Sequence, residues 1–383
     1  MPLSKINTNS IANTATPNVT SVVFSDGSVI SSGSQGFKNK IINGAMMISQ
    51  RGTSFSGLTD GNNASYSLDR WNWSETGTST GVQTISQDTV SPPAGFINSL
   101  KVLTTTAHAV GSGNGYNISQ WIEGLNVADL GWGTASAATV TVSFWVKSSL
   151  TGTFAGGLVN AAFDTSYVFN YTISAANTWE KKTVTIPGPT SGTFPTDNGR
   201  SFRLIFDLGT GSTYQTATTN AWISANVYST SGSQSVVGTL NATFNITGVQ
   251  LEKGSTASSF EFRSYGKELM LCQRYLPYWK FDGSSQIFTN SFVMSTTASG
   301  VFSVASPVPT RVAPTGVTVS SASHFAASEG DSGITFNNFS FHSGSYTGMA
   351  ITWGSGSTKT AFRPIVVYNT STSAYFYGTG CEL

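Results

Sequence analysis

Low charge and a high aromatic content mark this sequence of 383 residues, which is long enough for two or three domains. Only 10% of the residues are charged, against about 25% in an average globular protein, and aromatic residues make up 12%. The net charge of +1 gives no electrostatic reason to expect a nucleic-acid partner or an anionic membrane surface, and abundant Gly, Ser and Thr favour short strands over helices.

Residues 1–36 are predicted to be a docking segment rather than a folded domain. They contain no apolar stretch that would form a signal peptide or cross a membrane, so we expect no membrane insertion. Two short apolar pieces, Val22–Phe24 and Val29–Ile30, flank an Asp-Gly pair and predict a small hairpin, and residues 31–36 have the composition of a flexible hinge. Such a segment has no core of its own, so it should become ordered only on another protein.

Residues 37–262 are predicted to form a β-sandwich. Within Val140–Val146 the valines and Phe144 occupy alternate positions, as on the inward face of a strand. The same alternation recurs in Phe202–Phe206 and Phe244–Leu251, and turn signals separate the apolar pieces. Many short strands of this kind indicate two packed sheets.

One helix is predicted, from roughly Gly266 to Leu276, inside a connector of residues 263–281. Four side chains lie along one side of this helix: Tyr265, Leu269, Cys272 and Leu276. Pro277 ends the helix because proline cannot continue the hydrogen-bond pattern. This seam suits packing against a partner helix, and it equally suits packing on the chain's own sheet.

Residues 282–383 are predicted to form a second, smaller β-domain. Strand-like patterns return there, for example at Val301–Val304, Ile351–Trp353 and Ile365–Tyr368. The predicted fold is therefore mostly β, with a short N-terminal anchor, a β-sandwich, one short helix and a smaller C-terminal β-domain.

No catalytic or metal-binding motif stands out. Thr-Ala-His at His108 and Gly-Asp-Ser-Gly at Ser332 look like fragments of a serine protease, but they fall in the two different β-domains. No histidine has a second His or Cys at metal spacing, and Cys272 and Cys381 form neither a disulfide framework nor a metal motif. The acidic residues show no pair suited to glycoside hydrolysis. We expect no enzymatic activity, no cofactor and no metal site.

Aromatic side chains are the candidates for ligand binding. Sugars pack their C–H faces on exposed rings, while amides and carboxylates hold their hydroxyls. The candidate ligand-binding residues are Trp73, Tyr116 and Trp132. Tyr116 follows Gly-Asn-Gly in a predicted loop and is expected to be the best exposed. A tryptophan of a sandwich is often a core residue, so this alternative stays open for each.

Five stretches, in order along residues 38–383, resemble phage tail-fibre and receptor-binding proteins. IINGAMMISQRGTSF, from Ile41, and YSLDRWNW, from Tyr66, resemble the family's Asn-Gly-x-Phe-x-Ile-x-Gln-Arg-Gly and Tyr-x-x-Asp-Arg-Trp. ITGVQLEKGSTASSFEFRSYGKELMLCQRY resembles the close of the same domain. The remaining two are the Pro-Val-x-x-Arg-x-x-Pro pattern that ends at Pro314 and the Cys-Glu-Leu of residues 381–383, which is similar to the family's Ala-Glu-Leu.

The resemblance implies a carbohydrate-binding jelly roll for residues 37–262 and a homotrimeric assembly. In such a trimer the four seam residues of the predicted helix are the expected trimer contacts. Ile41–Arg51 would be the first strand of the jelly roll and Val249–Glu252 its last, and the two would pair.

Related modules often hold a structural calcium through an acidic residue after the Asn-Gly pair. Here that stretch is Ala45–Ile48, which leaves Asn43 and Glu252, while Ca²⁺ prefers several oxygen ligands and usually carboxylates. A calcium site is therefore doubtful. The charged and polar pairs of the motifs are expected to pin strand ends rather than bind a ligand; these pairs are Asp69 with Arg70, Gln50 with Arg51, and Glu261 with Arg263.

The function implied is that of a virion structural protein, a phage tail fibre assembled in the host cytoplasm. Residues 1–36 would dock on the tail or on another virion protein, and the β-domains would bind host surface glycan without cleaving it. Three alternatives stay open: a head decoration or adaptor protein that binds only virion components, a tailspike that degrades polysaccharide, and a carbohydrate-binding module with no virion role.

Overall fold

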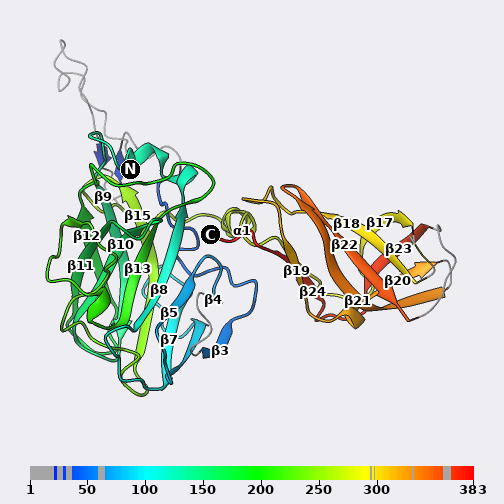
Figure 1. The fold of residues 1–383 in the computed structure, drawn as a ribbon, viewed down its shortest axis with the longest axis horizontal. Helices are drawn as coiled ribbons and strands as arrows, with labels where there is room; N and C mark the ends of the chain where they lie inside the picture. Colours follow the sequence, from blue (N-terminus) through cyan, green and yellow to red (C-terminus); the bar gives the residue numbers. More distant parts are fainter. Residues whose placement is uncertain are drawn as a thin grey trace, which may run out of the picture.

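Two β-domains lie on either side of a short helix in the computed structural model (Figure 1). The structure describes residues 21–23, 29–31, 37–58, 65–293, 296, 298–329, 332–356 and 364–383. Strands β1 (Ser21–Val23) and β2 (Val29–Ser31) pair antiparallel, which confirms the small N-terminal hairpin. Its predicted turn, most of the predicted hinge and the first twenty residues of the predicted docking segment lie outside the described residues.

The first domain is the predicted jelly-roll sandwich of two antiparallel sheets. One sheet has seven strands, in the order β14 (Trp222–Ile223), β11 (Ser166–Ile173), β10 (Gly152–Asn160), β13 (Arg200–Thr210), β8 (Gly115–Glu123), β5 (Asn72–Thr76) and β4 (Ser65–Tyr66). The other has six, in the order β12 (Glu180–Ile186), β9 (Val140–Ser148), β15 (Thr243–Lys253), β7 (Ser99–Thr106), β6 (Val82–Asp88) and β3 (Ser54–Leu58). Short 3-10 turns lie at Gly124–Asn126, Ala128–Leu130 and Ser212–Tyr214.

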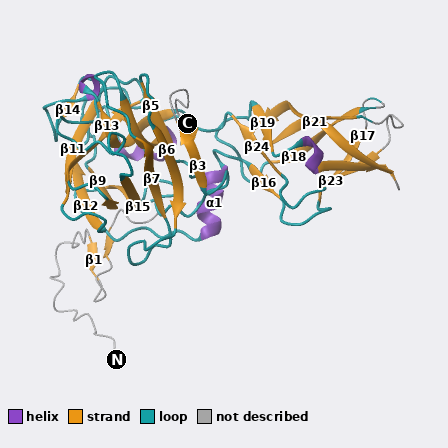
Figure 2. Cartoon of the chain, turned by 90° about the horizontal axis from the view of Figure 1, so that it is seen from below, coloured by secondary structure: helices purple, strands orange, loops and turns teal. Residues whose placement is uncertain are grey.

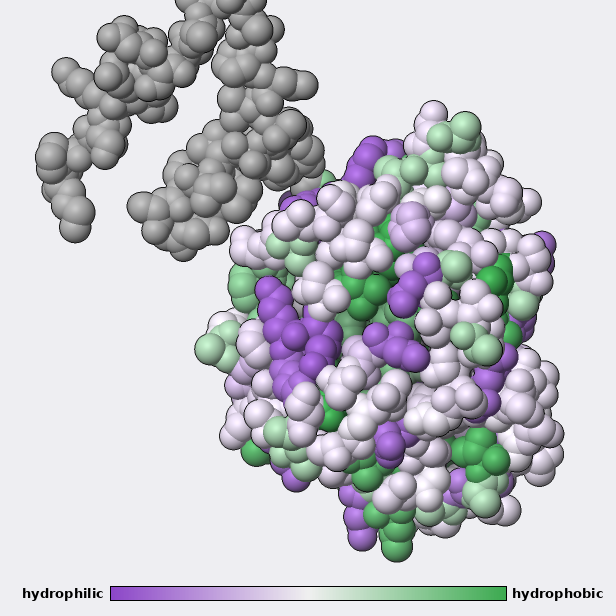
Figure 3. Space-filling view, turned by 90° about the vertical axis from the view of Figure 1, so that its left-hand side faces the viewer, coloured by the Kyte–Doolittle hydropathy of each residue, from purple (hydrophilic) through white to green (hydrophobic). Residues whose placement is uncertain are grey.

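Alternating apolar side chains build the core between these sheets. Phe144 of β9 meets Phe206 of β13 with ring centroids 5.0 Å apart, and both rings are fully buried. Burial of one such side chain contributes about 1.5–3 kcal/mol. On the side away from the second domain, Figure 3 shows a surface mostly near neutral in hydropathy with hydrophilic side chains in small groups, as a chain with few charges requires.

The predicted first strand, Ile41–Arg51, is wrong. Asn43 and Met46 have φ values of 58° and 56°, so the segment turns instead of extending, and its apolar residues are buried within an irregular loop. The predicted pairing of first and last strands is wrong too, since β3 pairs with β6 whereas β15 pairs with β7 and β9. The loop nevertheless contacts β15, because Val249 N donates to Gly44 O over 3.0 Å.

Helix α1 (Tyr265–Gln273) begins one residue earlier and ends three residues earlier than predicted, and it packs on its own chain. Cys272 is fully buried among Ile42, Ile48 and Tyr275, and Leu276 is 1% exposed, so neither is free to meet another subunit. Leu269 is half-buried against the same residues. Tyr265, 57% exposed, is the only seam side chain that faces solvent. The seam is therefore a contact within the chain, as the alternative interpretation had it.

The second domain begins earlier than predicted, because β16 (Tyr278–Lys280), inside the expected connector, pairs with β24 (Tyr375–Thr379). The third strand of that small sheet is β19 (Gly316–Val319). The larger sheet runs in the order β17 (Ile287–Val293), β23 (Pro364–Asn369), β20 (Phe325–Glu329), β21 (Ser332–Ser345), β22 (Gly348–Ser355) and β18 (Ser299–Ala305), with a 3-10 turn at Ala322–His324. A separate aromatic core fills this domain.

Residues 381–383 return to the junction between the domains, beside α1, as Figures 1 and 2 both show. Leu383 is buried with Cys272, and its carbonyl accepts a hydrogen bond from the Tyr66 hydroxyl. No helix among the described residues is long and apolar enough to cross a membrane.

Candidate functional site

The three predicted ligand-binding aromatics lie in the core of the sandwich. Trp73 and Tyr116 are both fully buried, with ring centroids 6.1 Å apart, because β5 and β8 are neighbours. The expected exposure of Tyr116 is wrong, since this residue belongs to β8 rather than to a loop. Trp132 is 7% exposed and packs on Phe202. None of the three rings offers an open face to a sugar.

A half-buried tryptophan that sequence reasoning did not select lies directly outside Trp132. Trp222, in edge strand β14, meets Trp132 edge-on at 5.5 Å and Phe194 at 5.8 Å. Its indole Nε1 donates to Pro187 O over 2.6 Å. Packing and this hydrogen bond hold the ring in one orientation, so little side-chain entropy remains to be lost when a ligand binds.

Trp222 lines a cavity of about 320 Å³, which we call the Trp222 cavity. Its other polar walls are supplied by side chains of Asp164, Thr165, Ser191, Thr193 and Ser224. These residues come from three separate loops, which lie together beside the β11–β14 edge of the seven-stranded sheet.

The side chain of Asn160 links two of these loops, the one with Asp164 and the one with Thr193, by hydrogen bonds. Its side-chain oxygen accepts from the backbone N of Asp164 and Thr165, each over 3.1 Å, and its Nδ2 donates to Thr193 O over 3.2 Å. Because Asn160 is fully buried, these bonds are shielded from water and fix the two walls relative to each other.

Asp164 supplies a carboxylate at the rim of the cavity. Its Oδ1 accepts hydrogen bonds from Asn160 Nδ2 (2.7 Å) and Thr165 Oγ1 (3.0 Å). Its Oδ2 bonds to no residue that the structure describes, and the residue is exposed, so this oxygen can accept a ligand hydroxyl. A fixed ring, a carboxylate and several hydroxyls form the chemistry that recognises a sugar.

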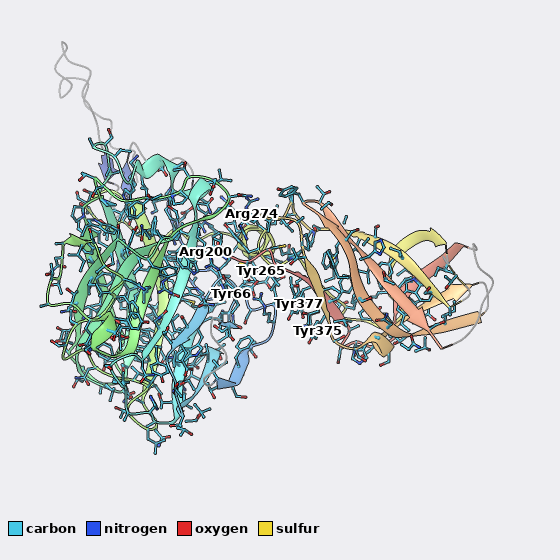
Figure 4. The ribbon with its side chains drawn as sticks, in the orientation of Figure 1. Tyr66, Arg200, Tyr265, Arg274, Tyr375 and Tyr377 are labelled. Atoms are coloured by element: carbon cyan, nitrogen blue, oxygen red, sulfur yellow. The ribbon has the colours of Figure 1, made fainter. Side chains whose placement is uncertain are left out.

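A second cavity, of about 330 Å³, lies at the junction between the domains. Ser49, Gln50, Gln273 and Lys280 contribute polar groups, and Tyr265 and Tyr278 contribute rings. Figure 4 shows Tyr265 at the junction, with Tyr375 and Tyr377 on the side of the second domain. Tyr278 itself is 9% exposed and stacks on those two tyrosines, so Tyr265, which is 57% exposed, supplies the open aromatic surface of this cavity.

The predicted polar pairs do pin the chain, and they do so around Glu382. Its carboxylate pairs with Arg51 (2.9 Å) and Arg70 (3.0 Å). Asp69 accepts hydrogen bonds from the backbone N and the side chain of Gln50, over 2.8 and 2.5 Å. Three of the motif stretches, those of Arg51, Arg70 and Glu382, thus meet at the junction and link the two domains.

A third pair of the motifs closes the loop at residues 39–43. Arg263 pairs with Glu261 (3.3 Å) and Glu268 (3.4 Å), and it donates to the carbonyls of Asn39 and Ile41. The structural role expected of Glu261 and Arg263 is therefore confirmed.

The two residues that could have held calcium are engaged in hydrogen bonds. Asn43 Oδ1 accepts from Ile48 N, and its Nδ2 donates to the carbonyls of Ile48 and Asp69. Glu252 accepts from the backbone N and hydroxyl of Ser258. Within the described parts of the chain, no three His, Cys, Asp or Glu side chains gather as a metal site. His108 and β21, which begins at Ser332, lie in different domains.

Comparison with known proteins finds only distant likeness. No protein-family model matches the chain, and no curated protein matches it by sequence. Among solved structures, the enzymatically active domain of bacteriophage CBA120 tailspike protein 4 is 15% identical, with a TM-score of 0.29; the match covers 56% of this chain but only 21% of that one. A family 4 carbohydrate-binding module (CBM4) is 13% identical, with a TM-score of 0.28 and 55% and 98% of the two chains covered.

A family 11 carbohydrate-binding module of a Clostridium thermocellum cellulosomal cellulase matches at 13% identity and a TM-score of 0.25, over 53% of this chain and 97% of that one. Likeness at this level assigns no function. The functional argument rests on the Trp222 cavity itself.

Proposed function

We propose that this chain is a glycan-binding protein of a phage virion, a tail fibre that adsorbs to host cells without cleaving the glycan. The Trp222 cavity carries the proposal, because it combines a fixed, half-exposed indole ring with the carboxylate of Asp164 and the hydroxyls around it. The virion role rests on the five motif stretches, and the ion pairs that join three of them, through Arg51, Arg70 and Glu382, support the idea that these act as one unit.

A homotrimer belongs to the same proposal. Single sugar sites bind weakly, and three copies on one fibre would raise the effective affinity through multivalency. Cys272 and Leu276 are buried within the chain, so of the four seam residues only Tyr265 and the half-buried Leu269 could take part in a trimer contact. Light scattering on the purified chain tests this assembly, and a monomeric mass at micromolar concentration would contradict it.

The decisive binding experiment replaces Trp222 with alanine. Aromatic packing contributes on the order of 1 kcal/mol, so Trp222→Ala should weaken glycan binding about fivefold. Trp179→Ala is the matched control, since Trp179 is also half-buried and its indole also donates to a backbone carbonyl, that of Ser91, but it lies outside the cavity. Equal binding by both variants, measured on the glycan array that identifies the ligand, would refute the assignment of the cavity.

Adsorption separates the proposal from its alternatives. The labelled full chain should bind host cells and not non-host cells, and excess unlabelled chain should block it. Release of reducing ends from host polysaccharide would instead identify a degrading tailspike. A folded chain that binds neither cells nor glycans would point to a decoration or adaptor protein.

A further inference from the structure

A buried arginine without a carboxylate partner lies on the outer face of the seven-stranded sheet. In β13, Phe202 and Leu204 face the core of the sandwich, so Arg203 between them points to the opposite side. Arg203 is only 8% exposed. Its guanidinium lies 5.3 Å from the ring centre of Trp121, 5.2 Å from Phe163 and 5.8 Å from Tyr228.

Arg200 adds a second positive charge at the same place. Its guanidinium lies 4.9 Å from the Trp121 ring, and Figure 4 shows it on the edge of the sandwich that faces the junction. We call Arg200, Arg203 and these three aromatic side chains the Arg203 cluster. Neither arginine forms an ion pair or a side-chain hydrogen bond with any residue that the structure describes, and the Nε of Arg203 is enclosed without a partner.

Two arginines of the junction do have acidic partners. Arg274 pairs with the buried carboxylate of Glu123 over 2.6 Å, and Arg70 pairs with Glu382. Burying a guanidinium away from water is costly unless an opposite charge compensates it, and aromatic rings recover only part of that cost. Burial, with the nearby Arg200 charge as a smaller contribution, lowers the pKa of Arg203 to about 10. The Arg203 cluster therefore has the electrostatics of an anion site.

The position of the cluster connects it to the Trp222 cavity. Phe163, which packs against Trp121 edge-on at 5.7 Å, directly precedes Asp164 in the β10–β11 turn. One short turn thus contributes a ring to the arginines and a carboxylate to the cavity. Asp164 repels a second carboxylate on its own side, so an acidic group of a ligand is better placed on the arginine side.

We propose that Arg203 and Arg200 bind the carboxylate of an acidic sugar, so that the glycan recognised by this chain contains uronic-acid or comparable carboxylated residues. The planar guanidinium matches a carboxylate with two parallel hydrogen bonds, and the ring of Phe163, which is 40% exposed, suits the C–H face of the same sugar. This inference rests on the proposed glycan binding and specifies its substrate class.

The test compares a glucuronic-acid-containing polysaccharide with the same polymer after its carboxyls have been reduced to hydroxymethyl groups. The full chain should bind the carboxylated polymer at least tenfold more tightly. Arg203→Met keeps the length and apolar contacts of the stem, and it should bind both polymers equally. Arg200→Gln should lose part of the preference for the carboxylated polymer. Lys181→Gln, which removes an exposed charge on β12 in the other sheet, should keep all of it.

Thermal unfolding of the same variants gives an independent readout. Because Arg203→Met removes an uncompensated buried charge, its melting temperature should equal or exceed that of the parent chain. Equal binding of the two polymers by the parent chain, with glycan binding intact, would overturn this inference and leave the proposed function standing. Unchanged preference in both arginine variants would also overturn it. Absence of binding to any glycan would overturn both.

Discussion

Replacement of Glu382 by glutamine should loosen the junction between the two domains. Arg70 is 1% exposed and its other contacts are the Trp121 carbonyl, 2.6 Å from Nη2, and the Tyr275 ring, 3.6 Å from the guanidinium carbon. The glutamine keeps the shape of the side chain and one acceptor oxygen, but it removes the charge that Arg70 and Arg51 share. Arg70 then remains enclosed without a paired carboxylate, and Arg51 keeps only the nearby charge of Asp69.

The expected loss in free energy of unfolding lies between the values measured for buried and for exposed ion pairs. Breaking a buried ion pair costs about 3–5 kcal/mol, and breaking an exposed one about 0–1 kcal/mol. Since the Glu382 and Arg51 side chains are 14% and 15% exposed, Glu382→Gln should cost about 2–4 kcal/mol. The matched control is Asp129→Asn, which breaks the pair with Lys40 at a carboxylate that is 50% exposed, and which should cost less than about 1 kcal/mol.

Urea unfolding followed by tryptophan fluorescence measures both variants, because urea, unlike guanidinium, does not screen charges. In Glu382→Gln we expect the transition of the sandwich to shift to lower urea and to separate from that of the second domain, since the domains are no longer coupled. Equal losses in Glu382→Gln and Asp129→Asn would refute the reasoning, because the Glu382 pairs would then behave as exposed ones.

Two further predictions concern the loop at Gly44 and the thiols. A Cβ at Gly44 would lie 2.1 Å from Val249 O, so Gly44→Ala should lower the melting temperature, whereas Gly266→Ala, with open space around it in α1, should leave it unchanged or raise it. Burial raises the pKa of the Cys272 thiol well above its usual value and that of Cys381 to about 11. Both thiols therefore stay protonated at pH 8 and should resist a disulfide reagent until urea unfolds the chain; modification of the native chain would contradict this.

The sandwich was predictable because the side chains of a strand alternate between two faces. Phe202 and Leu204 mark the inward face of β13 from the sequence alone. The same pattern says nothing about what covers the outer face. There Tyr214 and Tyr228, from the segment after β13, lie on Ile205 and Val159, so an outward residue such as Arg203 is buried as well. The burial of Arg203 is therefore determined by the path of the segment after β13, which the alternation of side chains does not show.

The loop at residues 41–51 shows how an apolar pattern can mislead. Ile41, Met46 and Ile48 are all buried, as residues of a central strand would be. Their backbone is irregular because Asn43 takes a left-handed conformation and bonds to Ile48 N through its side chain, in place of a ladder partner. The Asn-Gly pair at residues 43–44 is a sequence signal for a turn, but the resemblance favoured a strand at this position.

The Trp222 cavity was beyond sequence reasoning for a different reason. Its walls come from stretches around Asp164, Ser191 and Trp222, and no spacing within the sequence shows that these three stretches meet. Trp132 was selected instead, and it lies one layer behind, with its face on Phe202. An exposed ring and a buried ring have the same sequence signature, so the sequence alone did not distinguish Trp222 from Trp132.

The arrangement around Glu382 has a consequence for the order of events on the ribosome. The carboxylate that pairs with Arg51 and Arg70 belongs to Glu382, which is synthesised 331 and 312 residues after them. Until Glu382 is made, water must solvate the charges of these two arginines. The edge of the sandwich at the junction therefore stays accessible to solvent while the second domain is synthesised. A product that ends before residue 382 lacks this carboxylate, so the edge of its sandwich would be more open to cellular proteases.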